Sequence, residues 1–172
     1  MAEANQAVAT LLAHLDIEVL EANLFRGIPP NDGRPRVFGG LVAAQALIAA
    51  MRTVKDRAPH SLHGYFLRPG DPTRPIIYDV HRIRDGRSFA TRRVVAIQAG
   101  EAIFNMSVSF HRSEEGLTHQ HDMPEVPPPE GLRTVAQGWE QALEKSGKSV
   151  FEMLLSFERP IEHREPDPVD FL

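Results

Sequence analysis

Between residues 41 and 51 the chain is apolar at every position except Gln45. A helix over residues 38–53 with this composition has no hydrated side, so protein or lipid must surround it. At about 1.5 Å per residue the helix is far too short to cross a hydrocarbon core of about 30 Å. The pattern therefore predicts a buried helix that other parts of the protein wrap.

The stretches that follow this helix alternate apolar and polar residues, which is typical of strands with one buried face. The clearest is residues 103–110, where four apolar side chains share one face and polar side chains share the other. Asp85-Gly86 and Ala99-Gly100 are sequences typical of tight turns between antiparallel strands. Five strands are predicted, at residues 17–25, 61–67, 76–83, 89–98 and 103–110.

Apolar residues at helical spacing predict two further helices, at residues 7–15 and 133–145. The segment at residues 113–131 is rich in proline and acidic residues and has little to bury, which indicates a linker. Residues 157–169 are typical of an opening strand. The predicted organisation is a first domain at residues 1–112, a proline-rich linker at 113–132, and the helix and first strand of a truncated second domain at 133–172.

Composition narrows the functional classes. The net charge of −4 gives no electrostatic reason to expect nucleic acid as a partner. The sequence contains no cysteine, which excludes a disulfide framework, a thiolate nucleophile and a cysteine-based zinc site. The N-terminus does not have the pattern of a signal peptide, and the C-terminus is no recognised address. We therefore expect a cytoplasmic protein without membrane association.

Gly39 and Gly40 open the predicted buried helix. The first N–H groups of a helix have no partner within it and lie at its positive end, so they can polarise a carbonyl oxygen as an oxyanion hole does. A steric explanation is equally good, because glycine is required wherever a helix start is pressed against a sheet. Both explanations stay open.

Three arginines flank the predicted turn at Asp85-Gly86: Arg84, Arg87 and Arg92. The guanidinium fork suits a phosphate group, and Ser88 could add a hydrogen bond, so this turn is a candidate phosphate site. A hairpin turn explains the Asp-Gly pair without any ligand, and surface arginines are common.

His60 and His63 are candidates for acid–base chemistry, since imidazole titrates near neutral pH. Their spacing predicts opposite faces of one strand, so we expect a structural or solvated role for each. His119 and His121 lie in the predicted linker, and their spacing suggests no third metal ligand. No metal site is therefore expected.

Gln45 is alone among apolar residues and must find a hydrogen-bond partner, most simply inside the protein. Four aromatic side chains at strand positions could line an apolar tunnel, although ordinary core is the commoner role: Tyr65, Phe66, Phe89 and Phe104.

An ordered set of short motifs runs through residues 8–131, with weaker likeness at 159–162. The motifs are Phe25-Arg26-Gly27, Val37-Phe38-Gly39-Gly40, Gln45-Ala46-Leu47, His60-Ser61-Leu62-His63-Gly64-Tyr65-Phe66-Leu67-Arg68-Pro69-Gly70-Asp71, Arg84-Asp85-Gly86-Arg87-Ser88-Phe89 and Arg92-Arg93-Val94. In this order and spacing the set resembles the acyl-CoA thioesterase II family. Leu41 departs from the pattern, because relatives often carry Gln there.

The resemblance implies a hotdog fold, an α+β arrangement in which an antiparallel sheet wraps one central helix. It also implies hydrolysis of fatty acyl-CoA to a free fatty acid and coenzyme A, without a cofactor. That family has two hotdog domains in tandem, and the second is implied to carry a catalytic Asp, Gln and Ser/Thr. Those positions would lie beyond Leu172, so no catalytic residue is expected within this N-terminal hotdog.

With the resemblance, the arginines become candidates for the phosphates of coenzyme A. The residues expected to bind substrate are Phe38, Gly39, Gly40, His60, Tyr65, Arg68, Arg84, Arg87, Ser88 and Arg92. A single hotdog leaves an open edge strand, so we expect a homo-oligomer or pairing with a second hotdog half. A non-catalytic hotdog that binds an acyl thioester, or only builds an interface, is the alternative. A hotdog dehydratase is less favoured, since no hydratase-type motif of His and an acid is visible.

Overall fold

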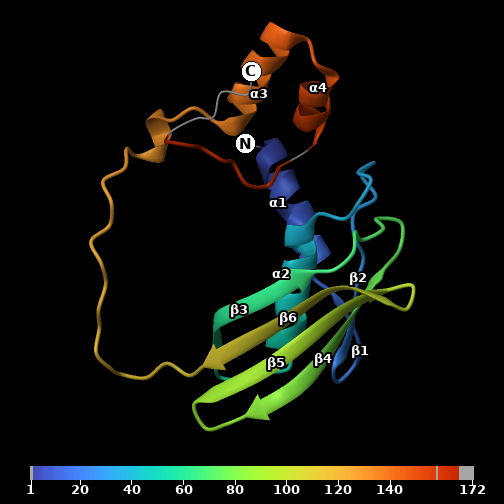
Figure 1. Cartoon of the computed structure of the whole chain (residues 1–172), viewed down its shortest axis with the longest axis vertical. Helices are drawn as coiled ribbons and strands as arrows, with labels where there is room; N and C mark the ends of the chain where they lie inside the picture. The colour runs from blue at the N-terminus through green and yellow to red at the C-terminus, as the bar shows by residue number, and fades with distance from the viewer. Residues whose placement is uncertain (1, 158, 167–172) are drawn as a thin grey trace. The chain divides into compact units, whose positions relative to one another are not determined.

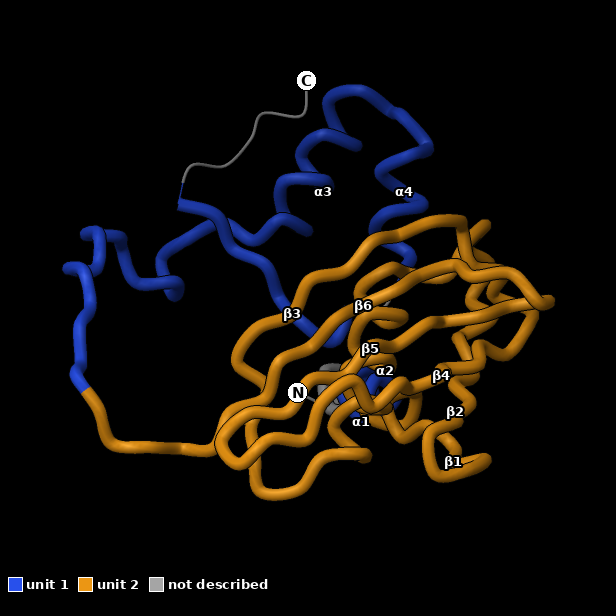
Figure 2. The backbone as a smooth tube through the Cα atoms, turned by 60° about the horizontal axis from the view of Figure 1, so that its bottom comes forward, with its two compact units in different colours: residues 1–11, 117–172 blue, residues 12–116 orange. Residues whose placement is uncertain are grey.

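The computed structural model describes residues 2–157 and 159–166, which divide into two compact units (Figure 2). One unit comprises residues 12–116, and the rest of the described chain belongs to the other.

The larger unit is built on one antiparallel sheet, with six strands among the described residues (Figure 1). In chain order the strands are β1 (Glu18–Glu21), β2 (Leu24–Gly27), β3 (Ala58–Phe66), β4 (Ile76–Asp85), β5 (Phe89–Gln98) and β6 (Glu101–His111). Their order across the sheet is β1-β2-β4-β5-β6-β3, so β1 and β3 form its edges. All neighbouring strands are antiparallel.

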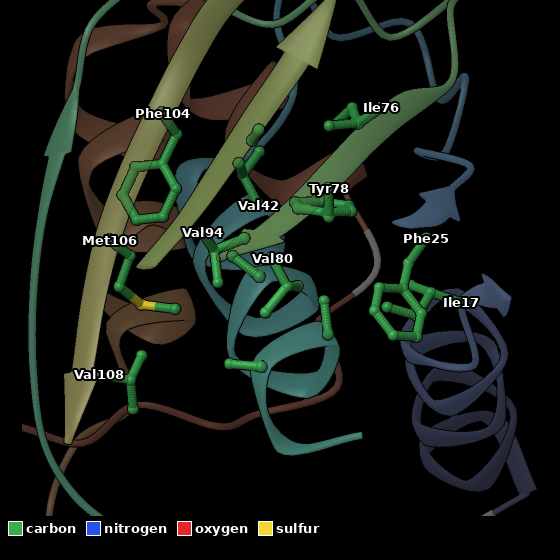
Figure 3. Close-up of a cluster of buried hydrophobic side chains, with 14 of the residues drawn as sticks. Ile17, Phe25, Val42, Ile76, Tyr78, Val80, Val94, Phe104, Met106 and Val108 are labelled. Atoms are coloured by element: carbon green, nitrogen blue, oxygen red, sulfur yellow. The ribbon is translucent and has the colours of Figure 1, made fainter. Parts of the chain in front are cut away.

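Helix α2 (Gly39–Met51) packs against one face of this sheet and contacts β2 to β6. Figure 3 shows Val80, Val94 and Met106 of three neighbouring strands beside α2, and all three are buried. This arrangement confirms the predicted buried helix and the α+β hotdog class. The helix side away from the sheet is only half-buried, at positions such as Leu47 and Ile48.

The prediction of a single first strand over residues 17–25 is wrong. The segment turns at Ala22 and Asn23 and forms the hairpin of β1 and β2, which raises the strand number from five to six. Asn23 ties this turn to β4, because its carbonyl accepts the N–H of Val80 at 2.8 Å and its side chain accepts the Arg82 guanidinium at 2.8 Å. The turn contains no glycine or proline, the residues that mark a turn most strongly in a sequence.

The four later strands are confirmed, and β5 has the predicted bounds. The turn between β5 and β6 places Ala99 at φ 50° and Gly100 at φ 81°. Two successive residues with positive φ make the tight turn whose twist suits an antiparallel hairpin. The predicted Asp85-Gly86 turn likewise joins β4 to β5.

Helix α1 (Ala2–Leu15) covers the helix predicted at residues 7–15, and its last residues belong to the larger unit. The other unit contains a short 3-10 turn, η1 (Pro129–Gly131), followed by α3 (Val135–Ser146) and α4 (Ser149–Ser156). Thr134 and Gln137 form a reciprocal capping box that starts α3, and Gly147 at φ 61° ends it. The helix predicted at residues 133–145 is confirmed, whereas α4 was not predicted.

Among the described residues of the range 157–169, the predicted opening strand is not found. Residues 159–166 contain only an isolated bridge from Arg164 to Thr134, and residues 158 and 167–169 lie outside the described residues. Residues 113–128 have neither helix nor strand and are exposed throughout. The proposed domain boundaries stay a prediction. No helix in the described ranges is long and apolar enough to cross a membrane.

Gln45 finds its partners inside the larger unit, as predicted. Its side-chain oxygen accepts the Tyr78 hydroxyl at 2.7 Å, and its nitrogen donates to the His14 carbonyl at 2.5 Å. Gly27 lies so close that a Cβ there would overlap the Gln45 amide. Burial raises the pKa of Tyr78, so the phenol stays protonated and continues to donate.

We predict that Tyr78→Phe lowers the free energy of unfolding by about 1–3 kcal/mol, because it leaves the buried Gln45 oxygen without a donor. Urea unfolding measures this loss. Tyr65→Phe is the matched control: the Tyr65 ring is 60% exposed, so a change within about 0.5 kcal/mol is expected. Equal losses in the two variants would contradict the role given to the Gln45–Tyr78 bond.

Candidate functional site

The start of α2 presents two unused backbone donors. Leu41 and Val42 donate their N–H groups to the Phe38 carbonyl at 3.1 and 3.3 Å. Among the described residues no acceptor meets the N–H of Gly39 or Gly40, and Phe38 provides no side-chain cap. The positive end of α2 can therefore still receive a carbonyl oxygen.

Aromatic rings cover both glycines. A Cβ on Gly39 would lie 2.9 Å from the Phe66 ring, and a Cβ on Gly40 would overlap the Phe38 ring. The steric explanation for the glycines therefore holds alongside the electrostatic one. Phe38 and Phe66 are 64% and 62% exposed, so the unused donors lie beside an apolar, solvent-facing surface.

Tyr65 does not join this surface. It pairs with Asn105 of β6, whereas its neighbour Phe66 pairs with the buried Phe104 on the face that packs against α2. The Tyr65 ring instead lies 4.9 Å from the His63 ring on the outer face of the sheet. Phe66 is the β3 aromatic next to the glycines, and strand alternation from Phe104 is the signal that could have identified it.

The expectation that His60 and His63 lie on opposite faces is wrong. A register shift between Pro59 and Ser61 inserts His60 as an extra residue in β3. The His60 ring therefore lies on the outer face, where it contacts the Ser109 hydroxyl at 2.9 Å. It also packs edge-on against Phe89 and His111, 5.8 and 5.9 Å between ring centroids.

Arg68 is engaged with the turn between β5 and β6. Its guanidinium donates to the Ala102 carbonyl at 2.8 Å and forms an ion pair with Glu101 at 3.0 Å. About half of the side chain is exposed (53%), so the charge is partly hydrated. These contacts explain Arg68 as a residue that holds this turn to the end of β3.

Arg92 is buried, with 1% exposure, and is not available as a free phosphate ligand. Its guanidinium donates to the Thr53 hydroxyl at 2.7 Å and to the Thr53 carbonyl at 3.1 Å, just after α2. It also reaches the Arg84 carbonyl at 3.0 Å and the Asp85 carboxylate at 2.6 Å. Buried and exposed residues alternate along β5, and this alternation places the Arg92 side chain inward. The prediction of Arg92 as a surface cation did not take the alternation into account.

Ser88 is also engaged within the larger unit. Its hydroxyl donates to Glu114 at 2.5 Å, and the other carboxylate oxygen of Glu114 lies 3.2 Å from the His111 ring nitrogen. The Ser88 hydrogen bond, followed by that from His111, lowers the pKa of Glu114. The first residues after β6 are thereby fixed to the turn between β4 and β5.

The candidate residues fall into two groups at opposite ends of α2. Phe38, Gly39 and Gly40 lie at its start beside Phe66, whereas the arginine turn lies beyond its end. Along β6, Phe104 opposite Phe66 and His111 opposite Phe89 are seven positions apart. At about 3.4 Å per residue this separation is about 24 Å, so a ligand that contacts both groups must be extended.

The remaining aromatic and histidine candidates have structural explanations. Phe104 is buried core, while Phe89 is stacked on His111 at 4.2 Å on the outer face. His119 and His121 lie edge to face at 5.0 Å. The part of the chain that the structure describes holds no cluster of three side chains suited to a metal ion.

Residues 28–111 match the family model described as the acyl-CoA thioesterase N-terminal domain. Mouse acyl-coenzyme A thioesterase 8 is 47% identical over 124 residues, which cover 69% of this chain and 38% of the mouse protein. Acyl-CoA thioesterase 2 of Haemophilus influenzae is 46% identical over 121 residues, 70% of this chain and 42% of that protein. The chain thus spans less than half the length of the curated relatives it matches.

Solved structures give the same result. The acyl-CoA thioesterase II TesB2 of Mycobacterium marinum is 49% identical, with a TM-score of 0.63 over 70% of this chain and 45% of that chain. The tesB protein of Mycobacterium avium subsp. paratuberculosis is 38% identical, with a TM-score of 0.68 over 72% of this chain and 50% of that chain. The Escherichia coli PaaI protein, 15% identical with a TM-score of 0.53, shares the fold; 64% of this chain and 94% of that chain are covered.

The Asp85–Arg92 pair predicts a small pH dependence of stability. The hydrogen bond from Arg92 is the main cause that lowers the pKa of Asp85 in the folded protein. This carboxylate therefore contributes stability above about pH 4, and the contribution is lost as the pH falls through the folded-state pKa. Half of the side chain is exposed (52%), so the contribution is at most about 1 kcal/mol.

Chemical unfolding of Asp85→Asn between pH 2.5 and 7 tests this dependence. The stability difference from the wild type should shrink as the pH falls below about 4, because both proteins then lack the charge at residue 85. Asp122→Asn, in the exposed segment without helix or strand, is the control and should give no pH-dependent difference. A constant difference for Asp85→Asn across the range would contradict the assignment.

Proposed function

The chain belongs to the acyl-CoA thioesterase family through its N-terminal domain at residues 28–111, and we propose that the complete protein hydrolyses fatty acyl-CoA to a free fatty acid and coenzyme A. Identity of 46–47% to two thioesterases over about 70% of the chain supports this activity. The observation that carries the proposal in the structure is the pair of unused N–H groups at Gly39 and Gly40.

In the proposed reaction, the thioester carbonyl oxygen lies at the start of α2. Water attacks the carbonyl carbon, and the negative charge that develops on the oxygen is stabilised by the N–H groups of Gly39 and Gly40. The carbon–sulfur bond then breaks, the sulfur takes up a proton as coenzyme A leaves, and the acyl group is released as the acid. The groups that activate the water would come from a second hotdog domain.

The two groups of candidate residues suggest how an extended substrate lies. The exposed rings of Phe38 and Phe66 are apolar neighbours for the acyl group next to the thioester. Arg84 and Arg87, about 24 Å away by the spacing along β6, would meet the phosphates of coenzyme A. Arg92 supports this turn from inside, and Tyr65, His60 and Arg68 have structural contacts in place of the substrate contacts first expected.

A partner hotdog, either a second copy or a second half, is proposed to cover the β3 edge. We call the exposed apolar side chains there the edge patch: Phe38, Leu62, Phe66 and Leu67. Leu62 and Phe66 lie on the strand face toward α2 yet are 55% and 62% exposed, because β3 is an edge strand of the sheet that the structure describes. A sheet edge beside an apolar surface favours pairing with another sheet.

The cytoplasmic location stays a prediction.

Gly39→Pro and Gly39→Ala separate the two explanations of the glycines. Proline at the first helical position removes only an N–H that is already unpaired, and Phe38 at φ −64° and ψ 123° has a conformation that accepts a following proline. Alanine adds the same Cβ but keeps the N–H. In the protein that includes the second hotdog, we expect Gly39→Pro to lower kcat for decanoyl-CoA about 100-fold or more, and Gly39→Ala much less.

Release of free thiol measures the rate, and thermal unfolding confirms that both variants fold. Equal losses in the two variants would show a purely steric role for Gly39. The wild-type 172-residue chain is assayed in parallel. If both the chain and the protein with the second hotdog bind decanoyl-CoA without turnover, the alternative of a non-catalytic binding module replaces the thioesterase proposal.

We predict that the 172-residue chain is a homodimer or larger at micromolar concentration in light scattering. Leu62→Ser combined with Phe66→Ser should shift it toward monomer, because both changes remove apolar area from the edge patch. Val126→Ser, exposed in the segment without helix or strand, is the control and should leave the mass unchanged. A monomeric wild type would contradict self-association through β3.

A further inference from the structure

Two arginines from different parts of the larger unit hold the turn at residues 84–87 from within. Arg92, on β5, donates to the Arg84 carbonyl and to the Asp85 carboxylate, at 3.0 and 2.6 Å. Arg57, just before β3, donates to the carbonyls of Gly86 and Arg87, at 2.6 and 3.1 Å. Every residue of the turn thus gives one oxygen to an inward guanidinium.

The Arg92 guanidinium is anchored to the segment after α2 through both oxygens of Thr53. Arg57 is anchored through the Lys55 carbonyl at 3.3 Å. The Nε of Arg57 is buried and meets no hydrogen-bond acceptor among the described residues. The terminal nitrogens of Arg57 nevertheless make three hydrogen bonds, to the Lys55, Gly86 and Arg87 carbonyls, so Arg57 holds the turn at the cost of one unmet buried donor.

Four oxygens of the turn thus accept hydrogen bonds from inward guanidinium groups, whereas two further arginine side chains of the turn do not take part. Arg84 and Arg87 are exposed, and their side chains have no hydrogen bond or ion pair within the described ranges. Asp85, the acidic residue of this turn, is paired with Arg92. Ser88 donates to Glu114, so its hydroxyl is not free. The exposed positive charges of this turn are therefore those of the Arg84 and Arg87 side chains.

We infer that Arg92 and Arg57 are positioning residues that hold Arg84 and Arg87 as a binding site for the phosphorylated nucleotide end of coenzyme A. Guanidinium groups bind phosphate through paired hydrogen bonds, and a turn that is already rigid loses little freedom when the anion binds. The inference rests on the proposed function, because that function supplies a ligand with phosphates at the end opposite its sulfur.

The separation within the larger unit fits such a ligand. The unused N–H groups lie at the start of α2. At the other end of this helix, Arg92 joins the turn at residues 84–87 to Thr53, which follows the last residues of α2. A substrate with a thioester at one end and phosphates at the other can meet both. A fatty acid product has its only charge at the carboxyl group and would not need the second site.

Calorimetric titration of the 172-residue chain tests the inference with two thioethers that cannot be hydrolysed. S-decyl-coenzyme A carries the phosphates, and S-decyl-pantetheine lacks them. Arg84→Gln combined with Arg87→Gln should raise the Kd of S-decyl-coenzyme A at least about tenfold and leave that of S-decyl-pantetheine unchanged. Arg93→Gln is the control, since Arg93 is an exposed arginine of β5 outside the turn at residues 84–87, and should change neither Kd.

Arg92→Lys tests the positioning role, because lysine keeps the charge but cannot make the forked contacts to Thr53, Arg84 and Asp85. We expect its Kd for S-decyl-coenzyme A to rise several-fold while its Kd for S-decyl-pantetheine stays the same. A purely structural role would weaken both ligands alike or neither. Should Arg92→Lys not fold, Asp85→Asn, at a half-exposed position, is expected to give the same selective change.

Unchanged affinity for S-decyl-coenzyme A in the folded double variant would overturn the phosphate site. Unchanged affinity in both folded Arg92→Lys and Asp85→Asn would overturn the positioning role. Failure of the proposed function has a different signature: the wild type would not bind S-decyl-pantetheine. In that case binding of adenosine 3′,5′-bisphosphate, lost in the double variant, would still support the anion site, and its absence would overturn it.

Discussion

The need to cover an apolar helix organises the larger unit. Helix α2 has a single polar side chain between residues 41 and 51, and the sheet buries the side that faces it. Two buried polar contacts fix the helix within this sheet. Gln45 bonds to Tyr78 of β4 and to the His14 carbonyl, and Thr53, just beyond the helix, bonds to Arg92 of β5. Because the helix is held at its middle and its end, its start has a defined position.

That position gives the two ends of α2 different chemistry. At the start, glycine removes the side chains that would collide with Phe38 and Phe66 and leaves two N–H groups unpaired. Beyond the end, Arg92 and Arg57 donate to four oxygens of the turn, and the Arg84 and Arg87 side chains stay exposed. One end offers hydrogen-bond donors beside apolar rings, and the other offers exposed positive charge. An acyl thioester of coenzyme A has the same division along its length.

Much of this fold could be predicted from local patterns. The buried helix and the strands β4, β5 and β6 have strong periodicity and turn sequences at their ends, so their positions were close to those observed. The β1–β2 hairpin was missed because its turn, Ala22-Asn23, carries no glycine or proline to mark it. The face of His60 was missed because one inserted residue in β3 reverses the alternation, and pairing with β6 is what reveals it. Helix α4 was not predicted, and a strand was predicted for the residues that follow it.

The sequence by itself determined the central helix, the strand class of the residues that wrap it, and the family, because each depends on neighbours in the chain or on ordered motifs. Only the tertiary structure decided which candidate residues can meet a ligand. Arg84, Arg87 and Arg92 are equivalent candidates in the sequence. In the structure Arg92 lies inward with 1% exposure, whereas Arg84 and Arg87 are exposed. The difference is set by strand register and by the Thr53 and Asp85 oxygens that satisfy the buried guanidinium. Burial of a charge is decided by partners from distant parts of the chain, which no local pattern contains.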